Sequence, residues 1–445
     1  MDIVVCFALF LAAMLFCLVK GFSLAWALLI ALLALFGMGL RHGHSCPALW
    51  DMAKKNVPKA MIVVRVLCYI GFLTGLWRSA GTISFFIYYG IRIISPTIFV
   101  LVAFLLSVLL SYAFGTSFGA ASTAGVILMA LARAGGVNEA VTAGAILSGI
   151  YFGDRGSPVS SCASLVAALT ETDLYGNVKR MFKTAALPLI LCFGIYFLLS
   201  RANPIQVVDE QLLMLLRESF GVHVWMLLPA AVMLILPLFK MPIRRAMAIS
   251  AAAAFVLTVA LQSVSVPQAL RIAVHGYRPQ SAALAQVMSG GGFFSMFPTM
   301  MMNLFAAACT GLLEGMGLLE ALRGRLAAMR TRLGLFPMLI VSSTLTGICV
   351  CNQTISVMVV HQLVGDIYAR EGKEHEEFAM DIANSAVTIS GLIPWSIACS
   401  VPLSMMNADI SALPYACYLY LIPACYLFTK KFFFPAKSKE IETSV

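Results

Sequence analysis

Long apolar runs separated by short polar or charged segments make up most of the chain. About ten of these runs reach the length of a membrane-spanning helix, roughly 17 to 25 residues, and shorter interrupted pieces lie between them. The long runs are 2–19, 22–40, 60–76, 95–113, 184–200, 223–239, 246–262, 293–313, 335–351 and 411–429. The pattern predicts an all-α polytopic membrane protein with about ten full spans plus several half-length elements.

The composition agrees with this class and excludes an ordinary soluble protein. Hydrophobic residues make up 61% of the chain and charged residues only 11%, whereas a soluble domain usually carries about 25% charged residues. The net charge of +10 comes from basic clusters in short loops between apolar runs, which is how the positive-inside rule appears in a sequence. No nucleic-acid partner is therefore expected.

Loop charges also predict which loops face the cytoplasm. The basic clusters begin at Lys54, Lys179, Lys240, Arg323 and Lys430. We expect all of them on the cytoplasmic side, together with the C-terminus. The acid-bearing loops at 209–218 and 371–381 are then expected outside.

Sequence signals of catalytic or cofactor chemistry are absent. There is no G-x-G-x-x-G after a strand, no Walker A lysine and no H-E-x-x-H. The 12 cysteines lie mostly inside apolar runs without a C-x-x-C pair, so we read them as small buried residues. We expect no enzyme, no cofactor and no metal beyond a transported Na⁺, and therefore transport that is driven by a gradient.

Two similar seven-residue frames indicate a duplication. Residues 75–81 read GLWRSAG and residues 311–317 read GLLEGMG, 236 positions later, the difference between 75 and 311. The same offset carries the polar stretch 114–117 onto a second one at 350–353. Repeated membrane units are typical of secondary transporters, and the loop charges give the two halves opposite topology, so we expect inverted-topology repeats.

The duplication divides the chain into five expected segments. These are an N-terminal transmembrane hairpin and cytoplasmic loop at 1–57, a first transport repeat at 58–200, an outer loop and connecting helices at 201–280, a second transport repeat at 281–429, and a basic cytoplasmic tail at 430–445.

Four polar breaks interrupt the apolar runs, two in each half, at 115–123, 153–158, 344–354 and 384–395. Backbone freed from helical bonding is tolerated inside a membrane only where it is buried or lines a wet cavity. We therefore expect discontinuous helices and re-entrant hairpins that meet at the substrate site. Neutral oxygens of the kind that bind Na⁺ come from Thr116, Ser117, Ser122, Thr123, Asn352, Gln353, Thr354, Asn384 and Thr388. Each of them, taken singly, also fits a role in packing helices.

Two acidic residues are candidates for carrying a proton. Asp154 lies at a Gly- and Pro-flanked break among the hydroxyls of Ser157, Ser160 and Ser161, and an acid inside a membrane segment is a functional candidate by default. The alternative is that Asp154 caps the half-helix starting at Ser157, or pairs with the adjacent Arg155. Glu314 occupies the repeat position of Arg78, and the alternative for both is a charge at the membrane interface.

These segments resemble the NhaC family of Na⁺/H⁺ antiporters, within a broader ion-transporter superfamily. The resemblance runs from about 58 to 406. The segments that carry it are 75–83, 88–90, 115–119, 148–158 and 392–395. It implies an electrochemical antiporter with hairpin elements and a central ion site.

The sequence departs from the family at several acids. The family continues G-D-x-x-S-P with S-D-T-T-N, where this chain has SSCAS at 160–164, so Ser161 replaces the acid. A D-Q pair of the family is Asn352-Gln353 here, and an E-D pair is Ala383-Asn384. Asp154 and Glu314 are the matching acids that remain.

The sequence therefore indicates a secondary active transporter with alternating access at a midplane site between the repeats. Na⁺/H⁺ antiport is the leading function, and exchange or ion symport of a small organic acid or amino acid is the alternative, because lost carboxylates suit a substrate that brings its own. An ion channel or a non-transporting scaffold ranks lower. The expected partners are the lipid bilayer and the transported Na⁺ and H⁺ or organic solute, in a prokaryotic cytoplasmic membrane, with a homodimer left open.

Overall fold

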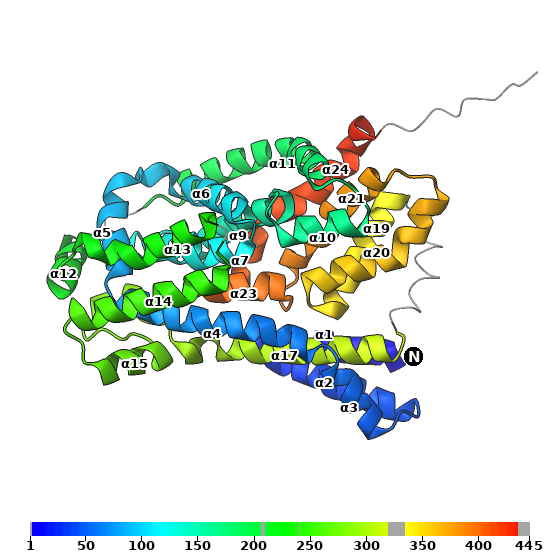
Figure 1. Cartoon of the computed structure of the whole chain (residues 1–445), viewed down its shortest axis with the longest axis horizontal. Helices are drawn as coiled ribbons and strands as arrows, with labels where there is room; N and C mark the ends of the chain where they lie inside the picture. Colours follow the sequence, from blue (N-terminus) through cyan, green and yellow to red (C-terminus); the bar gives the residue numbers. More distant parts are fainter. Residues whose placement is uncertain (1, 206–209, 240, 319–333, 435–445) are drawn as a thin grey trace, which may run out of the picture.

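The computed structural model describes residues 2–205, 210–239, 241–318 and 334–434, and they form helices packed along one long axis (Figure 1). Seven helices are long and apolar enough to cross a membrane, or nine if each of two bent helix pairs is one span, within the described residues. This count is below the ten spans expected from the apolar runs. Some runs form shorter helices, such as α19 (Leu335–Val350) and α24 (Cys417–Phe433).

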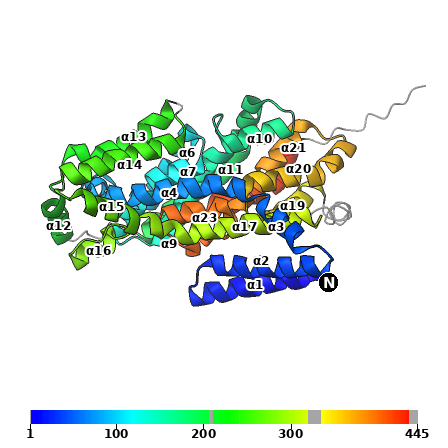
Figure 2. The ribbon, with the colours of Figure 1, turned by 60° about the horizontal axis from the view of Figure 1, so that its bottom comes forward.

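The chain begins with a helical hairpin and then repeats one succession of helices. The hairpin, α1 (Asp2–Lys20) and α2 (Leu24–Arg41), lies beside α17 at one edge of the molecule (Figure 2). After α3 (Cys46–Lys54), the first repeat contains α4 (Val57–Ser79), α5 (Thr82–Ile93), α6 (Phe99–Phe114), α7 (Ser117–Ala120), α8 (Val126–Ala134), α9 (Glu139–Gly156), α10 (Ser161–Leu169) and α11 (Leu174–Ala202).

Helices α12 (Glu210–Phe220), α13 (Leu228–Leu238), α14 (Ile243–Ala260), α15 (Val266–His275) and α16 (Ala282–Met288) connect the two repeats. The second repeat contains the 3₁₀ turn Phe293–Met296, α17 (Phe297–Gly315), α19, α20 (Gln353–Arg370), α21 (His375–Ala383), α22 (Ala386–Ile389), α23 (Ile397–Met405), the 3₁₀ turn Ile410–Tyr415 and α24.

The offset of 236 relates the repeats residue by residue, so the predicted duplication is confirmed. Phe99–Phe114 corresponds to Leu335–Val350, and the helical segment Ser117–Ala134 to Gln353–Arg370. Even the backbone at the first break repeats, because Gly115 (φ +64°) and Cys351 (φ +57°) are both left-handed. That conformation ends a helix and suits glycine better than cysteine, so the second copy keeps the turn without the favoured residue.

Equivalent helices run in opposite directions, which confirms the inverted topology. Helices α4 and α17 are equivalent and lie side by side. Asn56 Nδ2, just before α4, donates to Glu314 Oε2 near the end of α17 at 3.1 Å. At the other end, the N–H of Gly292, just before α17, donates to Gly71 O in the second half of α4 at 2.8 Å. The two helices are therefore antiparallel (Figure 1).

The loop-charge expectation was wrong for the acidic stretch 371–381. Lys430 Nζ pairs with Glu377 Oε1 at 2.8 Å and also with Asp381, and Arg180 lies 3.7 Å from Glu376. This stretch therefore lies at the same end of the molecule as two of the basic clusters, not opposite them. Opposite charges attract at short range, and here Glu377 and Asp381 are buried and need cations beside them.

The first break is also shorter than expected. The sequence suggested an interruption over 115–123, but the helix resumes at Ser117 and continues to Ala134 through a π-helical turn at Ala121–Gly125. A π turn keeps backbone groups hydrogen-bonded while it widens the helix, and such turns are common at functional sites. Only Gly115 and Thr116 leave the helical path.

Helices α6 and α9 pack so closely that glycines are required between them, and Gly153 makes the tightest contact. A Cβ atom on Gly153 would lie 2.0 Å from the carbonyl carbon of Ser111, whereas one on Gly156 would be 3.8 Å from its nearest neighbour outside the turn. We expect Gly153→Ala to destabilise the fold by at least about 1–3 kcal/mol, the usual cost of overpacking. Gly156→Ala, one turn later on the same helix, is the matched control and should leave the melting temperature in detergent unchanged. Equal melting temperatures for both variants would contradict the packing described here.

Candidate transport site

The left-handed residues Gly115 and Cys351 each end one helix, and a new half-helix begins two residues later. After them, Thr116 (φ −150°) and Asn352 (φ −137°) are extended, and helices begin at Ser117 and Gln353. The first N–H groups of a helix have no intrahelical acceptor, and the helix dipole places partial positive charge there. Each repeat thus offers one half-helix N-terminus.

Asp154 lies where these two N-termini meet. Its carboxylate is 6% exposed, and Oδ2 accepts from Ser117 Oγ at 3.4 Å. The Ser117 N–H and the side chain of Gln353 also lie beside it, close enough to stabilise its ionised form. Ser117 and Gln353 are equivalent positions of the two repeats, so one carboxylate from α9 is held by both halves. The partial positive charge of two helix N-termini stabilises its ionised form.

Two serines that follow Asp154 form hydrogen bonds with backbone groups. Ser160 Oγ donates to Asp154 O at 2.5 Å and accepts from Cys162 N at 3.1 Å, so Ser160 caps α10, which begins at Ser161. Ser157 Oγ donates to Tyr112 O at 2.7 Å. The alternative in which Asp154 caps this half-helix from Ser157 is therefore wrong. The side chain of Ser161 is exposed.

Arg155 points away from Asp154 and binds neutral acceptors, so the alternative pairing of these two residues is also wrong. The guanidinium is 1% exposed. It donates to Asn384 Oδ1 from Nε at 3.0 Å, to Tyr418 OH at 3.1 Å, to Thr184 Oγ1 at 2.7 Å, and to Met181 O. No carboxylate among the described residues forms an ion pair with it. A buried positive charge thus lies beside the site and ties α9 and α11 to the second repeat.

The second repeat contributes amides rather than acids. Asn384 accepts from Arg155, while its own Nδ2 is buried and has no partner within the described part of the chain. Gln353 Nε2 donates to Val387 O at 3.0 Å. Asn352 Oδ1 caps α20 by accepting from Ile355 N.

Other predicted site residues serve helix packing or face outward. The hydroxyl of Thr388 donates to Ser385 O in the preceding turn, and Ser122 and Thr123 both donate to Gly119 O. The Thr354 side chain is exposed. These residues border the breaks without contacting Asp154.

Glu314, the second proposed proton carrier, lies at the far end of α17. It accepts a hydrogen bond from Asn56 and is only partly buried. Asn56 in turn lines a small cavity together with Asn352. Arg78, its repeat counterpart, is buried and donates to Thr74 O at 2.9 Å. The structure therefore links Glu314 to the second break through Asn56, and does not bring it to Asp154.

Sequence reasoning missed two polar residues that shape the site. Arg155 was considered only as a partner for Asp154, and Tyr151 was not singled out. Tyr151 is fully buried on α9, and its hydroxyl donates to Ala398 O at 2.8 Å across the repeat boundary. A usable signal was their spacing, because Tyr151 lies three residues before Asp154 and four before Arg155 on α9, within about one turn of the helix.

Two cavities approach the site from different directions. One of about 440 Å³ lies between the end of α10 and helices α20 and α21. The other, of about 550 Å³, lies between the α1–α2 turn, α17 and α23, and Pro394 of the second break is in its lining. Asp154 lines neither cavity, so the carboxylate is shut off from both in this conformation.

The fold and the site define a membrane transporter: inverted repeats whose interrupted helices meet at one buried carboxylate. The sequence model of the Na⁺/H⁺ antiporter family matches residues 149–431. Because the match covers more than half of the chain, this protein belongs to that family.

Several named relatives align with most of the chain, and their names mention different substrates. The malate-2H⁺/Na⁺-lactate antiporter of Bacillus subtilis is 27% identical over 403 residues, 89% of this chain and 86% of that protein. The Na⁺/H⁺ antiporter NhaC of the same organism is 24% identical, over 85% of this chain and 88% of its own length. The arginine/ornithine antiporter ArcD of Halobacterium salinarum is 23% identical, over 84% and 79%.

Proposed function

We propose that this protein is a secondary active Na⁺/H⁺ antiporter that works by alternating access, with Asp154 binding a proton or Na⁺ in turn. The observation that carries the proposal is the position of Asp154 between Ser117 and Gln353, equivalent residues of the two inverted repeats. A carboxylate at that junction can be exposed first to one side and then to the other as the repeats exchange conformations. We further propose that the end bearing Lys430 and the C-terminus faces the cytoplasm.

A second candidate function is exchange of a small carboxylate, and it is favoured by the charge balance around the site. Asp154 is surrounded by two half-helix N-termini and lies next to the unpaired positive charge of Arg155. When Asp154 is protonated, these groups leave a positive environment that suits an anionic substrate. Among the relatives, one is named for malate and lactate and one for amino acids.

Purified protein in liposomes distinguishes these functions. The vesicles contain a pH-sensitive dye. An external pulse of Na⁺ should raise the pH inside the vesicles only if cations exchange for protons. Radiolabelled malate, lactate and arginine are then offered to the same vesicles with and without a Na⁺ gradient. A response to Na⁺ with no solute uptake supports Na⁺/H⁺ exchange, whereas solute uptake without a response to Na⁺ alone supports the second candidate. Absence of both, in vesicles that contain folded protein, would contradict both.

A further inference from the structure

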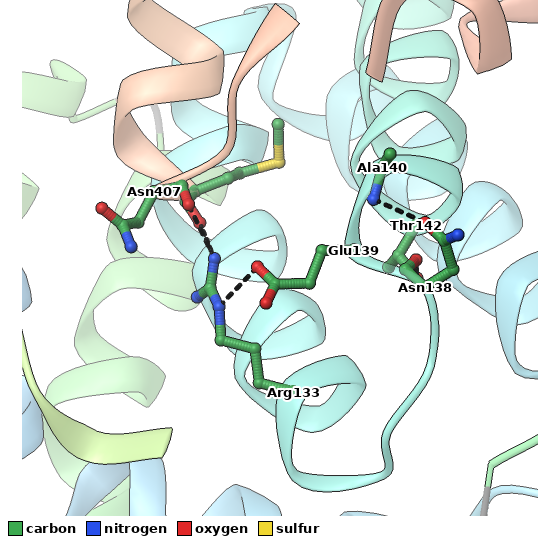
Figure 3. Close-up of polar contacts among 7 residues, drawn as sticks. Arg133, Asn138, Glu139, Ala140, Thr142 and Asn407 are labelled. Atoms are coloured by element: carbon green, nitrogen blue, oxygen red, sulfur yellow. Dashed lines mark hydrogen bonds and ion pairs between the residues drawn. The ribbon is translucent and has the colours of Figure 1, made fainter. Parts of the chain in front are cut away.

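Among the positions at which the two repeats differ, two equivalent pairs change the charge near the ends of the helices. On α8, the guanidinium of Arg133 is 11% exposed and pairs with Glu139 Oε2 at 2.8 Å. It also donates to the carbonyls of Met406 and Asn407, at 2.9 and 2.8 Å, in the turn after α23 (Figure 3). One side chain thus joins the end of α8, the start of α9 and the end of α23. We call these four residues the closing cluster.

Among the described residues, the equivalent positions at the opposite end lack this connection. Arg133 corresponds to Ala369, and Glu139 corresponds to His375, each 236 residues later. His375 contacts Thr170 O, the counterpart of Met406, at 2.9 Å. Ala369 has no charged group to reach across, and it lines the cavity of about 440 Å³ between α10, α20 and α21. We call this space the Ala369 cavity.

At the end with the closing cluster, the equivalent space is filled. The Met406 side chain lies against Gly125, 3.1 Å from the position that a Cβ atom there would take. Gly125 corresponds to His361, which lines the Ala369 cavity. Thr142, the counterpart of the cavity residue Phe378, is fully buried. Within the described residues, the space equivalent to the Ala369 cavity is therefore filled at the end with the closing cluster, where the separate cavity of about 550 Å³ is lined by Leu403, Ser404 and Ala408.

We infer that Arg133 holds the pathway closed at its own end, and that the Ala369 cavity is the vestibule from which solvent and substrate approach the site. The inference rests on the proposed transport function, because it assigns the two ends of one pathway. Inverted repeats alternate by exchanging conformations, so the closed repeat must release the contacts of Arg133 before that end can open.

The chemistry of Arg133 suits a reversible contact. Its cationic N–H groups bond carbonyls just beyond the C-terminal end of α23, where the helix dipole is negative, and such charge-assisted bonds are stronger than neutral ones. Its partner Glu139 is half exposed, so water can replace the carboxylate without leaving a buried charge. The vestibule also lies along the helix that leads to Gln353. His361 in its lining is eight residues from Gln353 on α20, about 12 Å at the helical rise.

The rate at which buried thiols react tests the inference without a transport assay. The protein is placed in lipid nanodiscs, so that both ends are reachable, and treated with a small charged methanethiosulfonate. We expect Phe378→Cys to react at least about tenfold faster than Thr142→Cys. Adding Arg133→Ala should speed the reaction of Thr142→Cys about tenfold, as expected for a shift in population between the two states. Arg133→Lys keeps a cation at the same carbonyls and should give an intermediate rate.

Controls separate opening from unfolding. Arg65→Ala removes an exposed arginine on α4 and should leave both rates unchanged. The native thiol of Cys399 is fully buried and should stay unreactive in every folded variant. If Arg133→Ala does not fold, the reciprocal double variant Ala369→Arg, His375→Glu builds the closing cluster at the other end. It should slow the reaction of Phe378→Cys at least about tenfold.

The inference is overturned if Thr142→Cys reacts as fast as Phe378→Cys while Arg133 is intact. It is also overturned if neither Arg133→Ala nor the reciprocal variant changes the rates. The proposed function fails separately. Vesicles with no exchange, together with the expected thiol rates, would leave the closing contact standing and remove the transport function.

Discussion

Replacing Asp154 with asparagine should reduce exchange in liposomes to the level of protein-free vesicles. Asparagine keeps the size of the side chain and can still bond Ser117 and Gln353, but it can neither bind a proton nor supply a negative charge. Asp154 is the acid that lies beside both half-helix N-termini. An acid inside a membrane segment costs free energy, so the acids that are found there usually have a function. The measurement is the initial rate of the dye response, or of solute uptake, per folded protein.

Asp51→Asn is the matched control, because Asp51 is an exposed acid on α3. It should exchange at the wild-type rate. Glu314→Gln tests the other predicted proton carrier and should retain exchange, since Glu314 contacts Asn56 and not Asp154. If Asp154→Asn exchanges normally and Glu314→Gln does not, the roles assigned here are reversed.

Replacing Arg155 with methionine should cause the largest loss of stability. Methionine has a similar length and no polar group, so Asn384 Oδ1, Thr184 Oγ1 and Tyr418 OH lose the hydrogen bond that Arg155 donates to them in a dry interior. Each buried polar group left unsatisfied costs about 1–3 kcal/mol, so the total is at least about 3 kcal/mol. Thermal unfolding monitored by size-exclusion chromatography measures the difference.

Arg65→Met, on an exposed arginine of α4, should leave the melting temperature unchanged. Asn384→Asp provides a second comparison, because it places a carboxylate against the Arg155 guanidinium and restores the acid that the family carries there. We expect it to fold at least as well as the wild type, because it pairs a buried charge that now has only neutral partners. A wild-type melting temperature for Arg155→Met would contradict the role of Arg155 in joining the repeats.

Most of the architecture could be predicted from the sequence, because equivalent helices and breaks of the two repeats keep the same spacing along the chain. The frames at Gly75 and Gly311 give the offset, and that offset predicts the break at Asn352 from the break at Thr116. Both breaks are visible because hydroxyls and amides stand where a membrane helix should be apolar. Asp154 is visible for the same reason, since an acid in such a segment is exceptional.

The partners of these residues were not predictable, because they depend on contacts between distant segments. Arg155 is next to Asp154 in sequence, yet its acceptors lie 26, 229 and 263 residues away. The predicted side of the loop 371–381 was wrong for a similar reason. The positive-inside rule counts basic residues in loops and contains no information on the contact between buried Glu377 and Lys430. Loop signs predicted the inverted topology correctly, although one of the loops was assigned to the wrong side.

Proton release by the purified protein tests directly whether Asp154 is the group that couples the proton to the transported ion or solute. Protein in weakly buffered detergent solution, with a pH indicator, is mixed with saturating Na⁺ and, separately, with malate. If Asp154 has this role, Na⁺ releases a proton from the wild type and none from Asp154→Asn, whereas a carboxylate substrate causes proton uptake that the same variant loses. Equal proton release by the wild type and Asp154→Asn would contradict it.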